Sequence, residues 1–209
     1  MILRDLLDPR ISLAEMDPAR ADETALPDAE RRIVAGVHPA RRARFAAGRL
    51  LARALLAERG FPAGSALLPG PSGAPLWPPG IRGSITHGQG RTAVALASAG
   101  DFAGLGIDLL PARPLPDGPL GLVAREEEIE AARAVGPLGG AVLFGAKEAV
   151  IKAAVGVDSR PLAPLAITIV LERGGSFAAE ILVEMGARRV AIGGRWRVAD
   201  GQIAVAVTL

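Results

Sequence analysis

The chain has 209 residues, a net charge of +2 and no cysteine, and half of its residues are hydrophobic while only 3% are aromatic. This length suits one large domain or two small fused ones with an aliphatic core. The lack of cysteine excludes disulfides, thiolate metal sites and cysteine nucleophiles. The near-neutral charge balance does not by itself predict nucleic-acid binding, although arginine is concentrated between residues 31 and 59.

No targeting or membrane segment is expected. The first ten residues, MILRDLLDPR, carry charges and lack a long apolar stretch, which is not typical of a secretory signal. No run reaches the roughly 18 apolar residues without a charge that a membrane-spanning helix needs. We therefore expect a cytoplasmic protein with neither membrane nor nucleic acid as partner.

The first quarter of the chain predicts an irregular or edge-strand segment over residues 1–27, followed by two helices. Asp28 can cap a helix that runs to about Val37, and Pro39 is well placed as the first residue of a second helix ending at Gly60. Helical spacing predicts one buried face on the second helix, formed by Phe45, Ala52, Leu55 and Leu56. The arginines of this helix are left for its other faces: Arg41, Arg42, Arg49 and Arg53.

The remaining elements alternate between strands and helices. Residues 61–80 are rich in proline and glycine and predict a loop with a short extended piece at 74–77, and 111–121 predict a linker or exposed loop. Strands are expected at 81–86, 92–97, 105–109, 166–171, 177–183, 190–198 and 203–208, and helices at 125–135 and 139–155. This order predicts an α+β fold of two halves, residues 1–105 and 106–209, acting as one functional unit.

Two segments place carboxylates and amines where chemistry is plausible. Asp108 follows an apolar run and should stand near a strand end, which suits a metal ligand or an ordinary turn cap. Glu148 and Lys152 are four residues apart and share a face of a helix that is otherwise apolar, with Lys147 beside them. These charges form either a solvent-facing ion pair or a ligand site, because a charge on a largely buried helix needs a partner.

Two further segments suit a phosphate group. Thr86 and His87 end a predicted strand at a glycine-rich turn, where a hydroxyl, an imidazole and free amides can bind an anion, or where a plain hairpin carries a surface histidine. Arg41 and Arg49 are about two helical turns apart, and fixed guanidinium groups bind phosphate well. The alternative for these arginines is an ordinary solvated helix face.

Read together, four segments resemble the ordered motifs of the 4′-phosphopantetheinyl transferase superfamily. They are RRARFAAGR (41–49), GAPLWPPGIRGSITH (73–87), GIDLL (106–110) and FGAKEAVIKA (144–153). The resemblance is closest to the siderophore-synthetase type, which includes enterobactin synthetase component D, and the terminal GRWRVADGQIAVAVTL (194–209) is also similar to that type. The likeness extends from about residue 30 to residue 209.

The resemblance implies a fold, a reaction and a metal site. The fold would be two similar α+β halves related by a pseudo-twofold axis, with coenzyme A in the cleft of a monomer. The reaction would be the holo-[acyl-carrier-protein] synthase type, which moves 4′-phosphopantetheine from coenzyme A to a carrier-protein serine and releases 3′,5′-ADP. Asp108 and Glu148 would hold Mg²⁺, Glu148 or a metal-bound water would serve as the base, and Lys152 would meet the phosphate with help from Lys147.

The same resemblance implies phosphate contacts and partners. Thr86 and His87 would contact the 3′-phosphate region of the nucleotide, and Arg41 and Arg49 would bind further coenzyme A phosphates. The acceptor would be a carrier domain of a peptide synthetase, a polyketide synthase or fatty-acid synthase. The first two are favoured by the resemblance to siderophore and secondary-metabolite enzymes.

Two positions depart from the family pattern. The family usually has an acidic residue two positions after the aspartate, and this chain has Leu110, which would put an apolar side chain beside the ion because residues 108 and 110 of a strand point the same way. We expect two protein carboxylates, an extra water and weaker metal affinity. A basic residue often found before the W-P stretch is Ser72 here, and Arg82 or Arg91 could take its place.

Two other functions remain as alternatives. A catalytically degenerate homologue would bind coenzyme A or a carrier protein without transfer, because of Leu110. A nucleic-acid binder built on the arginine-rich helix would show strongly salt-dependent binding, and it ranks last because the net charge is low and aromatic residues are few.

Overall fold

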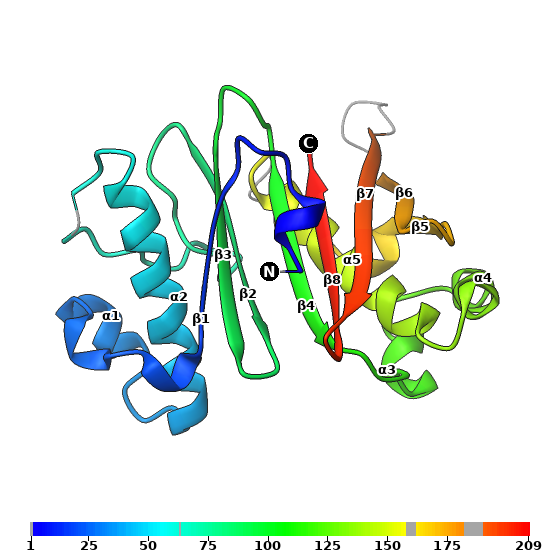
Figure 1. Ribbon diagram of the computed structural model, residues 1–209, viewed down its shortest axis with the longest axis horizontal. Coiled ribbons are helices and arrows are strands. Elements are labelled where there is room, and N and C mark those ends of the chain that lie inside the picture. Colours follow the sequence, from blue (N-terminus) through cyan, green and yellow to red (C-terminus); the bar gives the residue numbers. More distant parts are fainter. Residues whose placement is uncertain (1, 63, 158–161, 182–189) are drawn as a thin grey trace.

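Residues 2–62, 64–157, 162–181 and 190–209 are described by the computed structural model, in which two antiparallel sheets are each flanked by helices (Figure 1). The expected α+β class is therefore confirmed. In chain order the elements are η1 Arg4–Leu6, β1 Ser12–Met16, η2 Pro18–Arg20, η3 Glu23–Ala25, α1 Asp28–Ile33, α2 Pro39–Ala57, β2 Ile81–Gly88, β3 Arg91–Ser98, β4 Leu105–Pro111, α3 Asp117–Gly121, α4 Glu126–Val135, α5 Gly139–Val155, η4 Pro164–Ala166, β5 Ile167–Leu171, β6 Ser176–Ile181, β7 Val190–Ala199 and β8 Gln202–Thr208.

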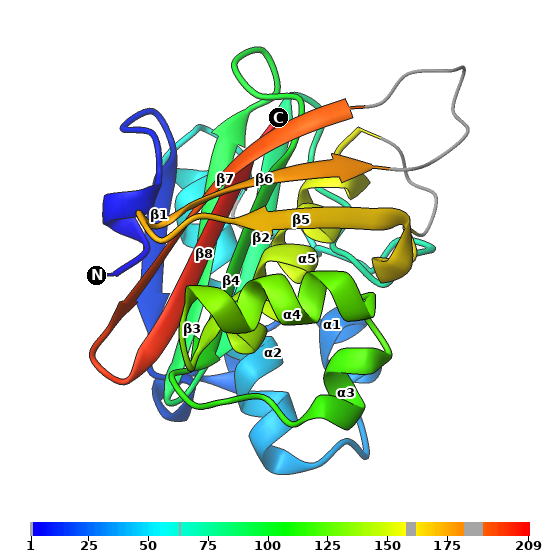
Figure 2. The same ribbon diagram turned by 90° about the vertical axis from the view of Figure 1, so that its right-hand side faces the viewer.

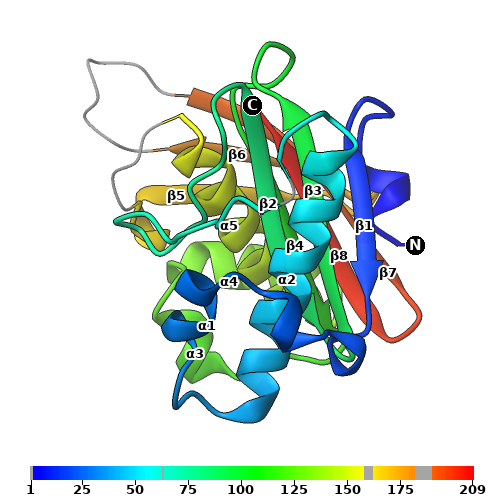
Figure 3. The ribbon, with the colours of Figure 1, turned by 90° about the vertical axis from the view of Figure 1, so that its left-hand side faces the viewer.

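The N-terminal sheet has three strands in the order β1-β3-β2, and α2 covers one of its faces (Figure 3). Side chains of a strand alternate between faces, so Val94 and Leu96 of β3 point to the α2 side. The cluster that joins this sheet to α2 contains Ala52, Leu55, Leu56, Leu67, Ile81, Val94 and Leu96. Three of the four residues predicted for the buried helix face, Ala52, Leu55 and Leu56, belong to this cluster. Their helical spacing lets one face of α2 pack on the sheet.

The C-terminal sheet has five strands in the order β4-β8-β7-β6-β5, and α5 packs along β4 and β8 with α4 beside it (Figure 2). Gly106 of β4 makes this packing close, because an added Cβ there would overlap the carbonyl oxygen of Ala149 on α5. The close approach brings the polar residues of α5 within reach of β4.

A third cluster joins both sheets to the N-terminal segment, which contributes Ile2, Leu3, Leu6, Leu7 and Ile11. It combines alternate residues of β3 with alternate residues of β4 and β8, and it includes Ala93, Ala95, Ala97, Leu105, Ile107, Leu109, Ala204 and Ala206. Figure 1 shows α1 and α2 beside the N-terminal sheet at one end of the molecule, α3 and α4 at the other end, and α5 behind the central strands β4 and β8. The residues of β4 that alternate with this cluster point towards α5.

Most predicted elements are present, with changed ends. The first helix ends at Ile33 and not near Val37, and the segment expected to be a loop over 111–121 contains the short helix α3. The described part of the strand predicted over 177–183 ends at Ile181, and its last two residues lie outside the described residues. The predicted boundary between the two halves, after residue 105, lies at the first residue of β4, and this division stays a prediction.

Burial of two arginines corrects the prediction for α2. Arg49 and Arg53 are only 6% and 7% exposed, whereas the sequence left them for outer faces. Arg53 pairs with the buried Glu30 of α1, and Arg49 donates to the Leu67 carbonyl. These partners lie outside α2, 18 and 23 residues from the arginines that they bind, so helical periodicity gave no sign of them.

Within the described ranges no single helix is long and apolar enough to cross a membrane. The helices α4 and α5 meet the length and composition criteria only when taken together, and they are bent by 119° at the break between them.

Candidate active site

The two halves meet along β2 and β4 through side-chain hydroxyl groups. The N–H of Ile107 donates to Ser84 Oγ and the N–H of Leu109 donates to Thr86 Oγ1, each at 3.0 Å. Two hydroxyl groups that are two residues apart on β2 thus accept from two amides that are two residues apart on β4. The spacings agree because alternate residues of a strand point to the same side. This seam fixes the end of β2 beside Asp108.

Asp108 has one oxygen that is fully bonded and one that is not. Its carboxylate is buried, and Oδ1 accepts from Thr86 Oγ1 at 2.9 Å and from Lys152 Nζ at 2.6 Å. Its Oδ2 is also buried and has no hydrogen-bond partner among the described residues. A buried carboxylate oxygen left without a partner is costly, and such an oxygen has the chemistry of a cation ligand.

Glu148 of α5 lies close enough to Asp108 for their charges to interact. Partial burial raises the pKa of Glu148, the positive charge of Lys152 lowers it, and the negative charge of Asp108 raises it. Asp108 and Glu148, which lie 40 residues apart in the sequence, therefore share one electrostatic site, in which Lys152 bonds to Asp108 and its charge acts on Glu148. Lys152 also donates to the Ile107 carbonyl at 3.1 Å.

Leu110 lies on the same face of β4 as Asp108, as predicted. Both side chains approach Gly145 of α5, where an added Cβ would lie 2.8 Å from Leu110 Cδ1 and 3.6 Å from Asp108 Oδ2. Across the described ranges, no group of three or more His, Asp and Glu residues is arranged to hold a metal ion. The acidic part of this site accordingly consists of two residues and not three.

His87 stands at the end of β2 in a positively charged corner. Partial desolvation, together with the positive charges of Lys152, Arg44 and Arg49, lowers its pKa from 6.5 to about 4, even though one side of the ring stays open to solvent. Its Nδ1 lies 3.0 Å from Thr92 Oγ1. Near neutral pH the ring is therefore uncharged, and it can contact an anion only by donating a hydrogen bond.

The helix α2 supplies the guanidinium groups of this corner. An added Cβ at Gly48 would lie 3.0 Å from Ile85 Cγ2 and 3.7 Å from His87 Cε1, so the absence of a side chain lets α2 cross β2 closely. Arg49 is held by the Leu67 carbonyl and by the Phe45 ring, whose centroid is 4.5 Å from the guanidinium carbon. Burial is the main cause that lowers the Arg49 pKa.

Arg41 and Arg44 complete the helix face. Arg41 is exposed in the first turn of α2, seven residues before Gly48, so it lies on the same stripe of the helix as that contact. Arg44 was not predicted from the sequence. It lies three residues after Arg41 and four before Gly48, and this helical spacing, which puts the three residues on one face of α2, is the signal that could have identified it.

The structure corrects the expectation for Lys147. Its Nζ is buried and donates to Glu128 Oε2 at 2.8 Å, to the Ile167 carbonyl at 2.9 Å and to the Pro164 carbonyl at 3.2 Å. These three bonds use all the donors of an ammonium group. Lys147 therefore stabilises the C-terminal half through Glu128, its buried partner, and has no donor left for coenzyme A.

Thr86 also has a different place from the one expected. Thr86 is 2% exposed, and its hydroxyl donates to Asp108 Oδ1 and accepts from Leu109 N–H. It orients the Asp108 carboxylate, and its single proton is already used in that bond. His87, one residue on, is the member of the pair that reaches the open side of the site.

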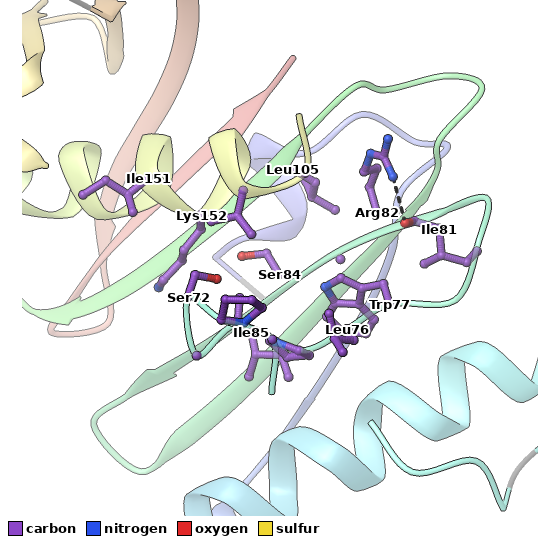
Figure 4. A pocket seen from close by; sticks show the side chains of 18 of the residues that line it. Ser72, Leu76, Trp77, Ile81, Arg82, Ser84, Ile85, Leu105, Ile151 and Lys152 are labelled. Carbon is purple, nitrogen blue, oxygen red and sulfur yellow. Dashed lines mark hydrogen bonds between the residues drawn. The ribbon is translucent and has the colours of Figure 1, made fainter. Parts of the chain in front are cut away.

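A cavity of about 760 Å³ adjoins the charged residues (Figure 4). Its walls come from the segment 70–79, from β2 and from α5, and they include Trp77, Ile85, Ile151 and Lys152. Lys152 therefore lies both in the cavity wall and on Asp108. Ser72 and Arg82 also line the cavity. Arg82 Nε donates to the Ala103 carbonyl at 2.8 Å, and Arg82 Nη1 donates to the Ile81 carbonyl at 3.4 Å, the bond that the dashed line in Figure 4 marks.

Comparisons with known proteins show to which family the chain belongs. A family model described as the 4′-phosphopantetheinyl transferase N-terminal domain matches residues 29–97. The 4′-phosphopantetheinyl transferase Npt of Nocardia iowensis is 34% identical over 99% of both chains. The chain belongs to the 4′-phosphopantetheinyl transferase family. The transferase is also similar to Svp of Streptomyces mobaraensis, at 41% identity over 84% of this chain and 75% of that protein, and to PptT of Mycobacterium tuberculosis, at 30% identity over 89% and 86%.

The regions matched in these comparisons include both parts of the candidate site. The matched N-terminal domain of this 4′-phosphopantetheinyl transferase contains Arg41, Arg49, Thr86 and His87. Its carboxylates lie beyond residue 97, in the region that the relatives also span. The siderophore-synthetase type named from the motifs stays a prediction.

Proposed function

We propose that this transferase moves the 4′-phosphopantetheine group of coenzyme A onto a serine of an apo carrier protein and releases 3′,5′-ADP. The observation that supports this most strongly is the buried Oδ2 of Asp108, which has no partner among the described residues and lies near Glu148, at the edge of a cavity whose wall contains Lys152. Carboxylates, an amine and a large cavity are what a reaction on a pyrophosphate ester needs.

The carboxylate pair fits a magnesium ion. Mg²⁺ takes oxygen ligands, usually one or two protein carboxylates together with waters and substrate phosphates. Asp108 and Glu148 would hold it, with water in the place that Leu110 denies to a third carboxylate. When bound, the ion would neutralise charge on the pyrophosphate and on the leaving nucleotide.

The remaining steps belong to side chains of the chain. Glu148 has a raised pKa, which suits a group that must accept the proton of the serine hydroxyl. Lys152 is 28% exposed, so its ammonium can turn from Asp108 to a phosphate oxygen in the cavity. Thr86 orients Asp108, because its hydroxyl donates a hydrogen bond to Oδ1.

The basic corner would hold the phosphates of the nucleotide. Arg49 and Arg44 supply charge beside His87, and the uncharged His87 supplies a hydrogen bond. Arg41 is exposed on the same helix stripe and extends this surface. We infer that coenzyme A lies along the line from this corner to Lys152.

The finer features of the proposal come from the family resemblance. The acceptor would be a carrier domain of a peptide synthetase or a polyketide synthase, with fatty-acid synthase as a further candidate. The transferase would act as a monomer in the cytoplasm, as a holo-[acyl-carrier-protein] synthase.

Mass spectrometry of the acceptor tests the proposal. The protein is incubated with Mg²⁺, coenzyme A and an apo carrier domain, and the carrier is expected to gain about 340 Da, the mass of the phosphopantetheine group. A carrier with its serine replaced by alanine is the control and should gain nothing. An unmodified carrier after incubation with a folded enzyme would contradict the proposal.

The packing of Leu110 favours one second candidate, a homologue that binds without transfer. Leu110 lies against Gly145 beside Asp108, where a third acidic ligand would otherwise stand. Coenzyme A binding measured by calorimetry, in a sample whose carrier gains no mass, would support this candidate over the transferase.

A further inference from the structure

Glu30 of α1 is a fully buried acid outside the candidate active site. Its Oε2 accepts from Arg53 Nη1 at 2.6 Å, its Oε1 accepts from the Leu67 N–H at 2.7 Å, and its side chain is 0% exposed. A buried carboxylate is tolerated only with such partners. Glu30 thereby ties α1 both to α2 and to the segment that follows α2.

The peptide groups of Leu67 are held on both sides. Its N–H donates to Glu30, and its carbonyl accepts from Arg49 Nε at 2.9 Å. A small hairpin begins at the next residue, where the Leu68 carbonyl accepts from Leu76 N–H at 2.8 Å and Gly70 N–H donates to the Ala74 carbonyl at 2.7 Å. We refer to residues 68–76 as the cavity hairpin. Its anchor point is Leu67.

The cavity hairpin forms part of the wall of the large cavity. Residues 70–76 all line that cavity, and Figure 4 shows Ser72 and Leu76 along it with Trp77 next in the chain. The hairpin is rich in glycine and proline and has few buried side chains of its own. Its position therefore depends on the buried anchor at Leu67 more than on packing of the hairpin itself.

Arg49 depends on the same anchor. The bond from Nε to the Leu67 carbonyl and the stacking on Phe45 fix the plane of the guanidinium group. Because Nε is used in this bond, only the two Nη groups are left to act towards His87, whose pKa the Arg49 charge lowers. A shift of Leu67 would turn this guanidinium away from its present direction.

We propose that Glu30 is a positioning residue for the transfer reaction, because through Leu67 it sets both the place of the cavity hairpin and the direction of the Arg49 guanidinium group. The effect on coenzyme A rests on the proposed function. The effect on the hairpin does not.

Two Glu30 variants separate positioning from stability. Glu30→Gln keeps the side-chain volume but leaves Arg53 as an unpaired buried charge. The double variant Glu30→Met with Arg53→Met removes both buried charges, a replacement that leaves stability nearly unchanged in comparable pairs, and it also frees Leu67. Glu128→Gln is the matched control, because Glu128 bonds Lys147 and the Ile169 N–H in the C-terminal half in the same manner.

Three measurements are made on the full-length protein. Hydrogen exchange at Gly70 and Leu76 should become faster in both Glu30 variants and stay unchanged in Glu128→Gln. The Kd for coenzyme A, measured by calorimetry, should rise about tenfold in both, the size expected when one charge-assisted contact is misplaced. The kcat at saturating coenzyme A should stay within about twofold, because the carboxylate site is untouched.

The outcomes are distinguishable. A folded double variant with the wild-type exchange rates and the wild-type Kd would overturn the proposal, since Glu30 would then only stabilise the fold. A wild-type protein that does not bind coenzyme A would overturn the proposed function, and the exchange rates would still decide whether Glu30 holds the cavity hairpin.

Discussion

At the scale of single residues, alternation along β4 gives neighbouring side chains opposite tasks. Leu105, Ile107 and Leu109 belong to the apolar cluster between the sheets, while Asp108 and Leu110 point towards α5. Asp108 is buried with one bonded and one unbonded oxygen. The chemistry of the site is therefore concentrated in very few atoms, and single substitutions should have separable effects.

Glu148→Gln should abolish transfer while leaving the fold intact. The amide has the same size but cannot accept the serine proton or hold a cation well, so we expect transfer to fall by about a thousandfold. Transfer is measured by the mass gain of the carrier and folding by circular dichroism. The same exchange at the exposed Glu126 is the control and should leave the rate unchanged.

Leu110→Glu should tighten magnesium binding, and transfer should stay unchanged or rise. The new carboxylate would point to the same side as Asp108, and one more acidic ligand should improve affinity about tenfold. Calorimetry with Mg²⁺ measures this, and Leu110→Gln controls for side-chain size. Our account of this position fails if Leu110→Glu is folded but inactive.

His87 should make the protein less stable in mild acid. Its folded pKa of about 4 is below its ordinary value of 6.5, so the unfolded chain binds more protons between these values. Stability attributable to His87 is therefore complete above pH 6.5 and declines as the pH falls towards 4. Urea unfolding across this window should show a shallower decline in His87→Gln than in the wild type, and His38→Gln serves as the comparison because His38 is exposed.

At the scale of elements, helices and strands with periodic apolar residues could be predicted from the sequence, whereas buried contacts between separate segments could not. The helices α2, α4 and α5 and most strands were predicted because their apolar spacing and their proline and glycine boundaries are local signals. The burial of Arg49 and Arg53 was not predicted, because Glu30 and Leu67 meet them only after folding. Lys147 was misassigned for the same reason, since Glu128 lies on a different helix.

The Glu128–Lys147 pair should be essential for the stability of the C-terminal half. Lys147→Met leaves Glu128 as an unpaired buried charge, which should lower the free energy of unfolding by about 3–5 kcal/mol. Combining it with Glu128→Met should recover most of the loss. Urea denaturation measures both. If Lys147→Met is as stable as the wild type, the pair has no such role.

At the scale of the whole molecule, the candidate site depends on how the two halves are joined. The sequence placed Asp108 and Glu148 in one half, and their proximity follows from the close packing of α5 on β4. The seam itself could not be predicted, because hydroxyl groups of β2 replace a backbone ladder between β2 and β4. Serine and threonine in a strand give no sign of such a role.

Thr86→Val should weaken the seam and the site together. Valine has the same shape but leaves the buried Leu109 N–H without an acceptor, which should cost about 1–3 kcal/mol, and it removes the proton that orients Asp108. Thr86→Ser keeps the hydroxyl and should restore most of both properties. Thermal unfolding and the transfer rate are the measurements, and a Thr86→Val protein with wild-type values of both would contradict this role.

The bond between Lys152 and Asp108 makes the two charges of the site depend on each other. An ammonium group that neutralises a carboxylate attracts a phosphate only weakly, so Lys152 gains its full attraction once another cation has taken over Asp108. Binding of a cation and of an anion at this site should therefore be cooperative. By thermodynamic linkage, each would then raise the affinity for the other by the same factor.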